Sequence, residues 1–277
     1  MRPLPRSIDR YQILKRLGAG QMGVLYLGRD PEIGRLVAVK VLKEDVEGEV
    51  RQRFLREAQV GRMIHQNIIL VFDVGEHDGQ PYIVMEYIDG APMAQLIKEK
   101  LAMPLDMRLR FIEQLCAGLQ CAHAAGVYHR DIKPENLMID RRHRLKILDF
   151  GVAHMDAPGA KSEITRAGSL MGTFNYMSPE QVMGEGTDYR TDIFSIGSVM
   201  YELLSFEQAF PGSLQDGVLQ RVLHEPHFPL GDVVPGIDPA IVAIVDKALE
   251  KDRDMRYQDC EAMENAIVSV RVRAVQT

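Results

Sequence analysis

The chain has 277 residues, 46% hydrophobic and 26% charged, which is typical of a soluble globular protein built as one large domain or two lobes. Its formal net charge of −6 gives no basic surface for nucleic acid, and no apolar run reaches the roughly 18 residues of a membrane span. The first residues lack the apolar stretch of a secretory signal, and the three cysteines fit no zinc spacing, so we expect reduced thiols and a cytoplasmic location.

The first predicted element is a pair of strands joined by a glycine-rich turn. Residues 11–17 and 24–27 are largely apolar, and Gly18, Gly20 and Gly23 lie between them at the spacing G-x-G-x-x-G. Glycines let a backbone turn tightly and approach phosphate groups without a clash of Cβ atoms. Dinucleotide-binding turns share this spacing, but a helix follows their glycines, whereas a strand follows here. A plain hairpin stays open on these residues alone.

A single lysine interrupts the next predicted strand, over residues 36–41. A lysine such as Lys40 is ordinarily one whose charged end reaches the surface past apolar neighbours. Residues 49–63 then show apolar side chains at helical spacing and include Glu57. A surface pair with Arg53, one helical turn earlier, would explain Glu57 without any functional role.

Two more strands follow, and beyond residue 87 the pattern becomes helical. We predict a helix over residues 107–125, with Asp106 as its N-cap and Gly126 ending it, and another helix over residues 188–205. The cysteines and the histidine within the first of these helices are interpreted as packing residues: Cys116, Cys121 and His123.

The most informative stretch is HRDIKPEN at 129–136, followed by DFG at 149–151. Pro134 removes a backbone donor, so the stretch is a loop, and the apolar runs between the two strings predict a short hairpin. We therefore expect four polar side chains to converge. Asp131 would supply a base and Lys133 a cation. Asn136 and Asp149 would supply oxygen ligands for a hard metal ion, which completes the set that phosphoryl transfer requires. A hairpin with merely solvated polar residues would explain either string alone.

Together, and in this order, the two strings resemble the catalytic and metal-binding loops of protein kinases. The resemblance covers roughly residues 11–270. Lys133, in the pattern D-x-K-P-x-x-N, is typical of serine/threonine kinases. Residues 172–181 and 248–257 are most similar to bacterial eukaryotic-type serine/threonine kinases, in which the kinase domain often precedes a membrane span and an outer sensor domain.

The resemblance implies an α+β, bilobal kinase fold that occupies residues 1–277 as one kinase domain. A small antiparallel sheet with one main helix would span residues 11–84. Residues 85–90 would form the hinge, and residues 91–277 a mainly helical lobe. ATP would bind between the lobes with Mg²⁺ or Mn²⁺.

The implied nucleotide site draws on the glycine turn, the strands and the hinge. Lys40, held by Glu57, would grip the α- and β-phosphates, and Met85 would form the back of the pocket, although on sequence alone Met85 is an ordinary core methionine. Leu25 stands where the family usually has valine. The full set is Leu17, Gly18, Gly20, Gly23, Leu25, Ala38, Lys40, Glu57, Met85, Glu86, Ile88, Met138 and Asp149.

Residues 152–176 correspond to the activation segment. Thr165 is the first candidate for regulatory autophosphorylation and Ser169 a weaker one, as is Ser162, with Arg130 as the natural partner of the added phosphate. Thr173 would hydrogen-bond the catalytic aspartate and lysine.

Three further residues are assigned structural support. Asp192 would accept backbone N–H groups of the catalytic loop, because a buried aspartate needs donors. The resemblance implies that Arg256 pairs with Glu180, whereas residues 251–257 taken by themselves are better explained as a solvated run of charges.

We therefore predict an ATP-dependent protein serine/threonine kinase, either cytoplasmic or the cytoplasmic part of a kinase anchored by segments absent from this chain. A nucleotide-binding pseudokinase scaffold and a small-molecule phosphotransferase of the same fold stay open. The intact charged positions argue against the first, and Lys133 against the second. Protein substrates are expected and nucleic acid is not. Dimerisation through the small lobe is known in the bacterial group, but no residue here establishes it.

Overall fold

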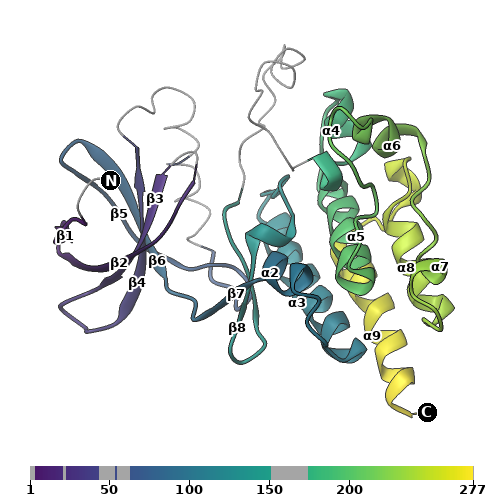
Figure 1. Ribbon diagram of the computed structural model, residues 1–277, viewed down its shortest axis with the longest axis horizontal. Helices are drawn as coiled ribbons and strands as arrows, with labels where there is room; N and C mark the ends of the chain where they lie inside the picture. Colours follow the sequence, from purple (N-terminus) through teal and green to yellow (C-terminus); the bar gives the residue numbers. More distant parts are fainter. Residues whose placement is uncertain (1–3, 21–22, 44–53, 55–62, 151–173, 277) are drawn as a thin grey trace. The chain divides into compact units, whose positions relative to one another are not determined.

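The computed structural model describes residues 4–20, 23–43, 54, 63–150 and 174–276 (Figure 1). The chain divides into two compact units, Met1–Asp89 and Gly90–Thr277, which we call the N-terminal unit and the C-terminal unit. This division falls within the predicted hinge, while the exact lobe limits stay a prediction. Among the described residues, no helix is both long and apolar enough to cross a membrane.

The N-terminal unit is an antiparallel sheet with strand order β1-β2-β3-β4-β6-β5. Its strands are β1 (Ser7–Ile8), β2 (Tyr11–Ala19), β3 (Gly23–Arg29), β4 (Leu36–Leu42), β5 (Val71–His77) and β6 (Gln80–Glu86). Val37 and Val39 on β4 are fully buried and pack with Tyr11, Tyr82 and Val84, because alternate residues of a strand share one face. The predicted strands before and after the glycine turn are therefore β2 and β3.

The C-terminal unit is mainly helical. Its helices are α2 (Met93–Lys98), α3 (Leu105–Ala124), α4 (Pro179–Met183), α5 (Arg190–Ser205), α6 (Val218–His224), α7 (Leu230–Val233), α8 (Pro239–Ala248) and α9 (Cys260–Gln276), with 3-10 turns η1 (Pro134–Asn136), η3 (Phe174–Tyr176) and η4 (Arg253–Met255). α5 is buried along almost its whole length and contacts α3 and α8, while α9 lies along α3 (Figure 1). α5 is therefore the central helix of this unit.

A small sheet of three strands, β7 (Gly90–Pro92), β8 (Leu137–Asp140) and β9 (Leu145–Ile147), completes the C-terminal unit. β8 and β9 are the predicted hairpin, with Leu137 opposite Ile147 and Ile139 opposite Leu145. All four side chains are buried, so the hairpin is fixed by its apolar face and presents a loop at each end. Together the two units confirm the predicted α+β class.

Candidate active site

Three of the four predicted catalytic and metal-binding side chains meet around the carboxylate of Asp131. The Nζ atom of Lys133 lies 2.9 Å from both carboxylate oxygens of Asp131. Asn136 donates from Nδ2 to the backbone oxygen of Asp131 at 2.8 Å and to its Oδ2 at 3.0 Å. The side chain of Asp131 is 31% exposed, so a substrate hydroxyl can still reach it. The result is an oriented, accessible carboxylate beside a fixed cation.

Asn136 also fits the role of a metal ligand. Its amide nitrogen donates to Asp131, and no hydrogen bond from a described residue reaches its amide oxygen. Mg²⁺ and Mn²⁺ prefer such oxygen ligands. Among the described residues, no three acidic, histidine or cysteine side chains gather into a metal cluster. Ligation by Asn136 and Asp149 would therefore leave most of the coordination sphere to water and substrate oxygens, as is usual for Mg²⁺ with phosphates.

Asp149 is positioned through the residues that precede it. The amide of Leu148 donates to the backbone oxygen of Asn136 at 2.8 Å, and the Leu148 oxygen lies 2.8 Å from Nε2 of His129. Asp149 itself has a φ of +38°, which is uncommon for a residue other than glycine. These two contacts of Leu148 tie the residue directly before Asp149 to the catalytic loop.

The catalytic loop is held from below by a buried carboxylate. Asp192 is fully buried on α5 and accepts the amide N–H of His129 at 2.9 Å and that of Arg130 at 2.7 Å. Burial alone raises the pKa of Asp192, but the hydrogen bonds from His123 and from the amide of Arg130 outweigh it and hold the pKa below its ordinary value. Arg130 has a φ of +61°, a strained conformation that costs on the order of 1 kcal/mol and needs such support.

A second buried support joins residues on either side of α5. Arg256 donates two parallel hydrogen bonds to Glu180, of 2.8 and 2.9 Å, and their side chains are 0% and 4% exposed. Burial raises the pKa of Glu180, but Arg256 lowers it more, so the carboxylate stays ionised. Next to Glu180, Gln181 donates from Nε2 to the backbone oxygen of Arg130 at 2.8 Å. The start of α4 is therefore tied to the catalytic loop.

The residues of the N-terminal unit that are predicted to bind the nucleotide, and that the structure describes, belong to its sheet and to the segment after it. Gly23 must be glycine, because a Cβ there would lie 2.4 Å from the backbone oxygen of Val41. Ala38 and Met85 are buried opposite each other on β4 and β6. The side chain of Glu86 accepts the amide of Leu70 at 2.9 Å and so fixes the end of β6.

The remaining residues of that set are less buried. Leu17 and Gly20 are exposed. The half-buried residues are Gly18, Leu25, Lys40, Ile88 and, in the C-terminal unit, Met138. Leu25 lies directly opposite Lys40 in the sheet. Four predicted site residues lie outside the described residues: Glu57, Thr165, Ser169 and Thr173, as does Ser162.

Sequence reasoning missed three features of the site. His123 is not only a packing residue, because its Nε2 atom lies 2.7 Å from Asp192 across 69 positions of sequence. The contact of Gln181 with Arg130 also has no local sequence signal. The third feature is a pocket of about 450 Å³ beside the catalytic loop, lined by Pro92, Ala94, Gln95, Lys98, Glu99 and Glu135.

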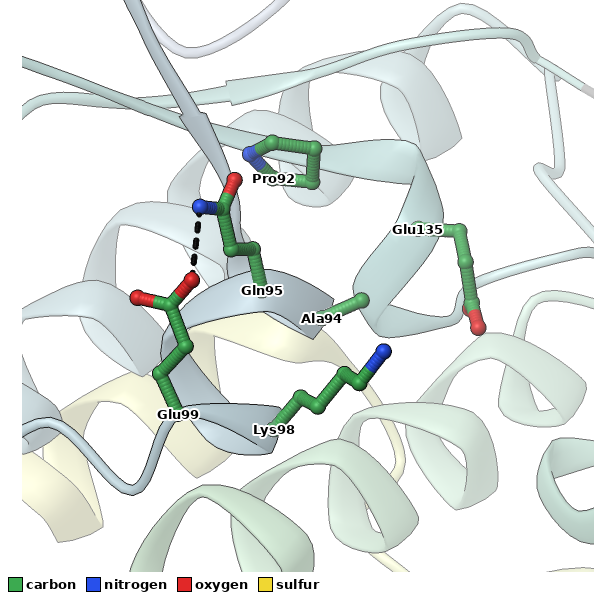
Figure 2. A pocket seen from close by; sticks show the side chains of 6 residues that line it. All are labelled: Pro92, Ala94, Gln95, Lys98, Glu99 and Glu135. Atoms are coloured by element: carbon green, nitrogen blue, oxygen red, sulfur yellow. Dashed lines mark hydrogen bonds between the residues drawn. The ribbon is translucent and has the colours of Figure 1, made fainter.

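Figure 2 shows the charged ends of Lys98, from α2, and Glu135, from η1, extending toward the same space. Gln95 donates to Glu99 at 2.8 Å on the other side of the pocket. Pro92 and Ala94 supply apolar wall. The pocket therefore combines an apolar surface with charges of both signs.

Comparison with known proteins gives one consistent result. The family described as protein kinase domain matches residues 11–267. A probable serine/threonine-protein kinase of Clostridium perfringens is 37% identical over 254 residues, which are 90% of this chain and 36% of that protein. Serine/threonine-protein kinase PknB of Mycobacterium leprae is 36% identical over 273 residues, 96% of this chain and 44% of that protein. Serine/threonine-protein kinase Pkn1 of Myxococcus xanthus is 37% identical over 266 residues, 93% of this chain and 38% of that protein. The chain thus spans less than half the length of these relatives.

Proposed function

This chain belongs to the protein kinase family, and from that premise we propose that it is an ATP-dependent protein serine/threonine kinase. The observation that carries the proposal is the set of contacts around Asp131, in which Lys133 and Asn136 fix an accessible carboxylate. Asp192, buried beneath the loop, keeps it in that position. A pseudokinase scaffold would not need this arrangement, and no observation favours one.

The chemistry assigned to these residues is transfer of the γ-phosphoryl group to a serine or threonine hydroxyl. Asp131 accepts the hydrogen bond of the hydroxyl, orients its oxygen for in-line attack and takes up the proton as the new P–O bond forms. The bond between the γ-phosphorus and the β,γ-bridging oxygen breaks, and ADP leaves. Lys133, already next to Asp131, neutralises charge on the transferred group.

ATP and a divalent metal ion follow from family membership, and their ligands are part of the proposal. We assign the nucleotide to the residues named from the sequence, with Lys40 on the phosphates. Asn136 and Asp149 would hold Mg²⁺ or Mn²⁺, which supplies charge neutralisation when bound. The amide oxygen of Asn136, to which no described residue donates, supports this assignment.

Partners and regulation extend the proposal beyond the single reaction. Protein substrates fit a member of this family. We place autophosphorylation at Thr165 or Ser169, with Arg130 as the partner of the phosphate. Dimerisation through the N-terminal unit, and anchoring of a longer protein to a membrane, rest on the resemblance to the bacterial group.

The decisive experiment is a phosphoryl-transfer assay on the purified chain. We expect transfer from ATP to the chain itself and to a generic basic protein with Mg²⁺ or Mn²⁺, and none with Lys40→Met. Phosphopeptide mapping should place the autophosphorylation within residues 162–169. A wild-type chain that shows a thermal shift with ATP and metal but transfers no phosphate would instead favour the scaffold.

A further inference from the structure

The imidazole of His123 is buried in the C-terminal unit with a partner on each nitrogen. Its side chain is 7% exposed. Nε2 lies 2.7 Å from Oδ2 of Asp192, and Nδ1 lies 3.7 Å from Sγ of Cys260, 137 positions away on α9. The rings of Tyr128 and Tyr189 lie 5.7 and 6.0 Å from the imidazole and enclose it. His123 therefore has one polar partner on each nitrogen and two aromatic neighbours.

The partners determine where the proton of the imidazole sits. Asp192 is ionised, because its pKa lies below the ordinary value, so it accepts hydrogen bonds and Nε2 must carry a hydrogen. When the imidazole carries a single hydrogen and that hydrogen is on Nε2, Nδ1 offers a lone pair to a donor. Burial raises the pKa of the Cys260 thiol well above its usual range, so the thiol keeps its hydrogen and can donate it.

The same carboxylate that accepts from His123 also holds the catalytic loop. Asp192 accepts the amides of His129 and Arg130, and Arg130 is the strained residue immediately before Asp131. The hydrogen bond from His123 thus orients the Asp192 carboxylate, and this carboxylate in turn positions the catalytic loop. A partner that fixes the imidazole acts on the loop through two hydrogen bonds in series.

We propose that Cys260 is a positioning residue for phosphoryl transfer: its thiol donates to Nδ1 of His123, keeps the imidazole proton on Nε2, and thereby aligns Asp192 with the catalytic loop. The catalytic consequence rests on the proposed kinase activity, whereas the hydrogen-bond pattern does not. Cys116 provides the contrast. It is an equally buried thiol on α3, and within the described chain no hydrogen bond joins it to a histidine.

The test compares two substitutions of Cys260: Cys260→Ala removes the donor, and Cys260→Ser retains one. The control is Cys116→Ala, which removes a buried thiol that, within the described chain, makes no hydrogen bond to His123. Two measurements are independent of activity: the ¹⁵N shifts of the His123 ring and the amide shift of Arg130. We expect a hydrogen-free Nδ1 and a protonated Nε2 in the wild type, in Cys260→Ser and in Cys116→Ala. Only Cys260→Ala should change the ring pattern and move the Arg130 amide.

In the transfer assay, Cys260→Ala should lower kcat about fivefold with KM for ATP unchanged, as expected for the loss of one hydrogen bond, while the two other variants stay within about twofold of the wild type. Equal losses in Cys260→Ser and Cys260→Ala, or an unmoved Arg130 amide in Cys260→Ala, would show that Cys260 only fills space and would overturn the inference. A wild type without transfer activity would overturn the proposed function, and the Arg130 amide would still decide the positioning role.

Discussion

Arg256 holds Glu180 by two parallel hydrogen bonds in the interior of the C-terminal unit, although the two residues are 76 positions apart. Arg256 also donates from Nε to the backbone oxygen of Glu250 at 2.7 Å and from its remaining N–H groups to the oxygens of Arg190 and Lys251. Thr191 donates to Glu180 at 2.8 Å. One guanidinium thus joins the start of α4, the start of α5 and the turn before α9.

We expect Arg256→Met to lower the free energy of unfolding by about 3–5 kcal/mol, because it leaves the carboxylate of Glu180 buried without its cation. Arg256→Lys should recover only part of this loss, since an ammonium cannot reproduce two parallel bonds. Urea unfolding followed by circular dichroism measures both.

Arg253 is a matched control for this prediction. It lies three residues before Arg256 on the same turn, but its side chain is 37% exposed and its nearest carboxylate oxygen, on Asp188, is 3.8 Å away. Arg253→Met should cost less than about 1 kcal/mol, as surface ion pairs do. Equal effects of the two substitutions would show that burial of the pair contributes nothing to stability.

The pH dependence of stability should carry the signature of Lys251. Burial, and then the charge of Arg256, lower the pKa of Lys251 to about 8, while an unfolded chain has a lysine pKa of about 10.4. Between these values the unfolded chain binds a proton that the folded chain has released, so the free energy of unfolding rises from pH 8 toward pH 10. Above about pH 10 the buried Tyr176, whose pKa burial raises, has the opposite effect.

Lys251→Met should remove the rise in unfolding free energy between pH 8 and pH 10, measured by urea titration at each pH. Lys247→Met is the control. The Nζ atom of Lys251 lies 3.9 Å from the ring centroid of Phe210. The Nζ atom of Lys247 lies 4.5 Å from that of Tyr257, but Lys247 is exposed. A rise that persists in Lys251→Met would assign the proton release to another group.

The parts of the site that are local in sequence could be predicted from it. The hairpin β8–β9 follows from two short apolar runs separated by a polar turn. Gly126, with a φ of +72°, lies just after α3, as the sequence indicated. The predicted N-cap was wrong: α3 begins at Leu105 after Pro104, whose fixed φ suits the residue before a helix, and Asp106 lies in the first turn. There it pairs with Arg110 and with Arg271 of α9.

The parts that depend on distant contacts could not be predicted from residue patterns. From its own segment, Arg256 is better explained by a solvated run of charges than by a buried pair, and only the tertiary structure shows that its side chain is buried. His123 and Cys260 each look like packing residues in their own segments. Their contact exists because α9 packs along α3, which no local pattern encodes.

The charges in the pocket beside the catalytic loop should influence which acceptor polypeptides are phosphorylated. Glu135 is four residues after Asp131, so their Cα atoms are at most about 14 Å apart, a distance that an extended acceptor spans in about four residues. We expect Glu135→Lys to raise KM for basic acceptor peptides about threefold at low salt and to leave KM for ATP unchanged, because an exposed charge acts weakly.

Lys98→Glu should have the opposite effect on the same basic peptides, since it removes the cation of the pocket. Steady-state kinetics with a basic peptide and an acidic peptide of equal length separates the two charges. Parallel changes for both peptides would mean that the substitutions disturb the catalytic loop instead of the pocket.

The strongest expectation concerns Asp131. Asp131→Asn should lower kcat by a factor of about a hundred to ten thousand, because an amide cannot accept the proton of the acceptor hydroxyl. The ion pair between Lys133 and Asp131 becomes a hydrogen bond to a neutral amide. The catalytic loop should nevertheless keep its position, because Asp192 binds the amides of His129 and Arg130 and not the side chain of Asp131. ATP affinity, measured by isothermal titration calorimetry with Mg²⁺, should therefore stay within about twofold of the wild type.

Asp78→Asn, at a carboxylate that is 89% exposed on the N-terminal unit, is the matched control and should leave kcat unchanged. Turnover of Asp131→Asn close to that of the wild type would remove Asp131 from the reaction.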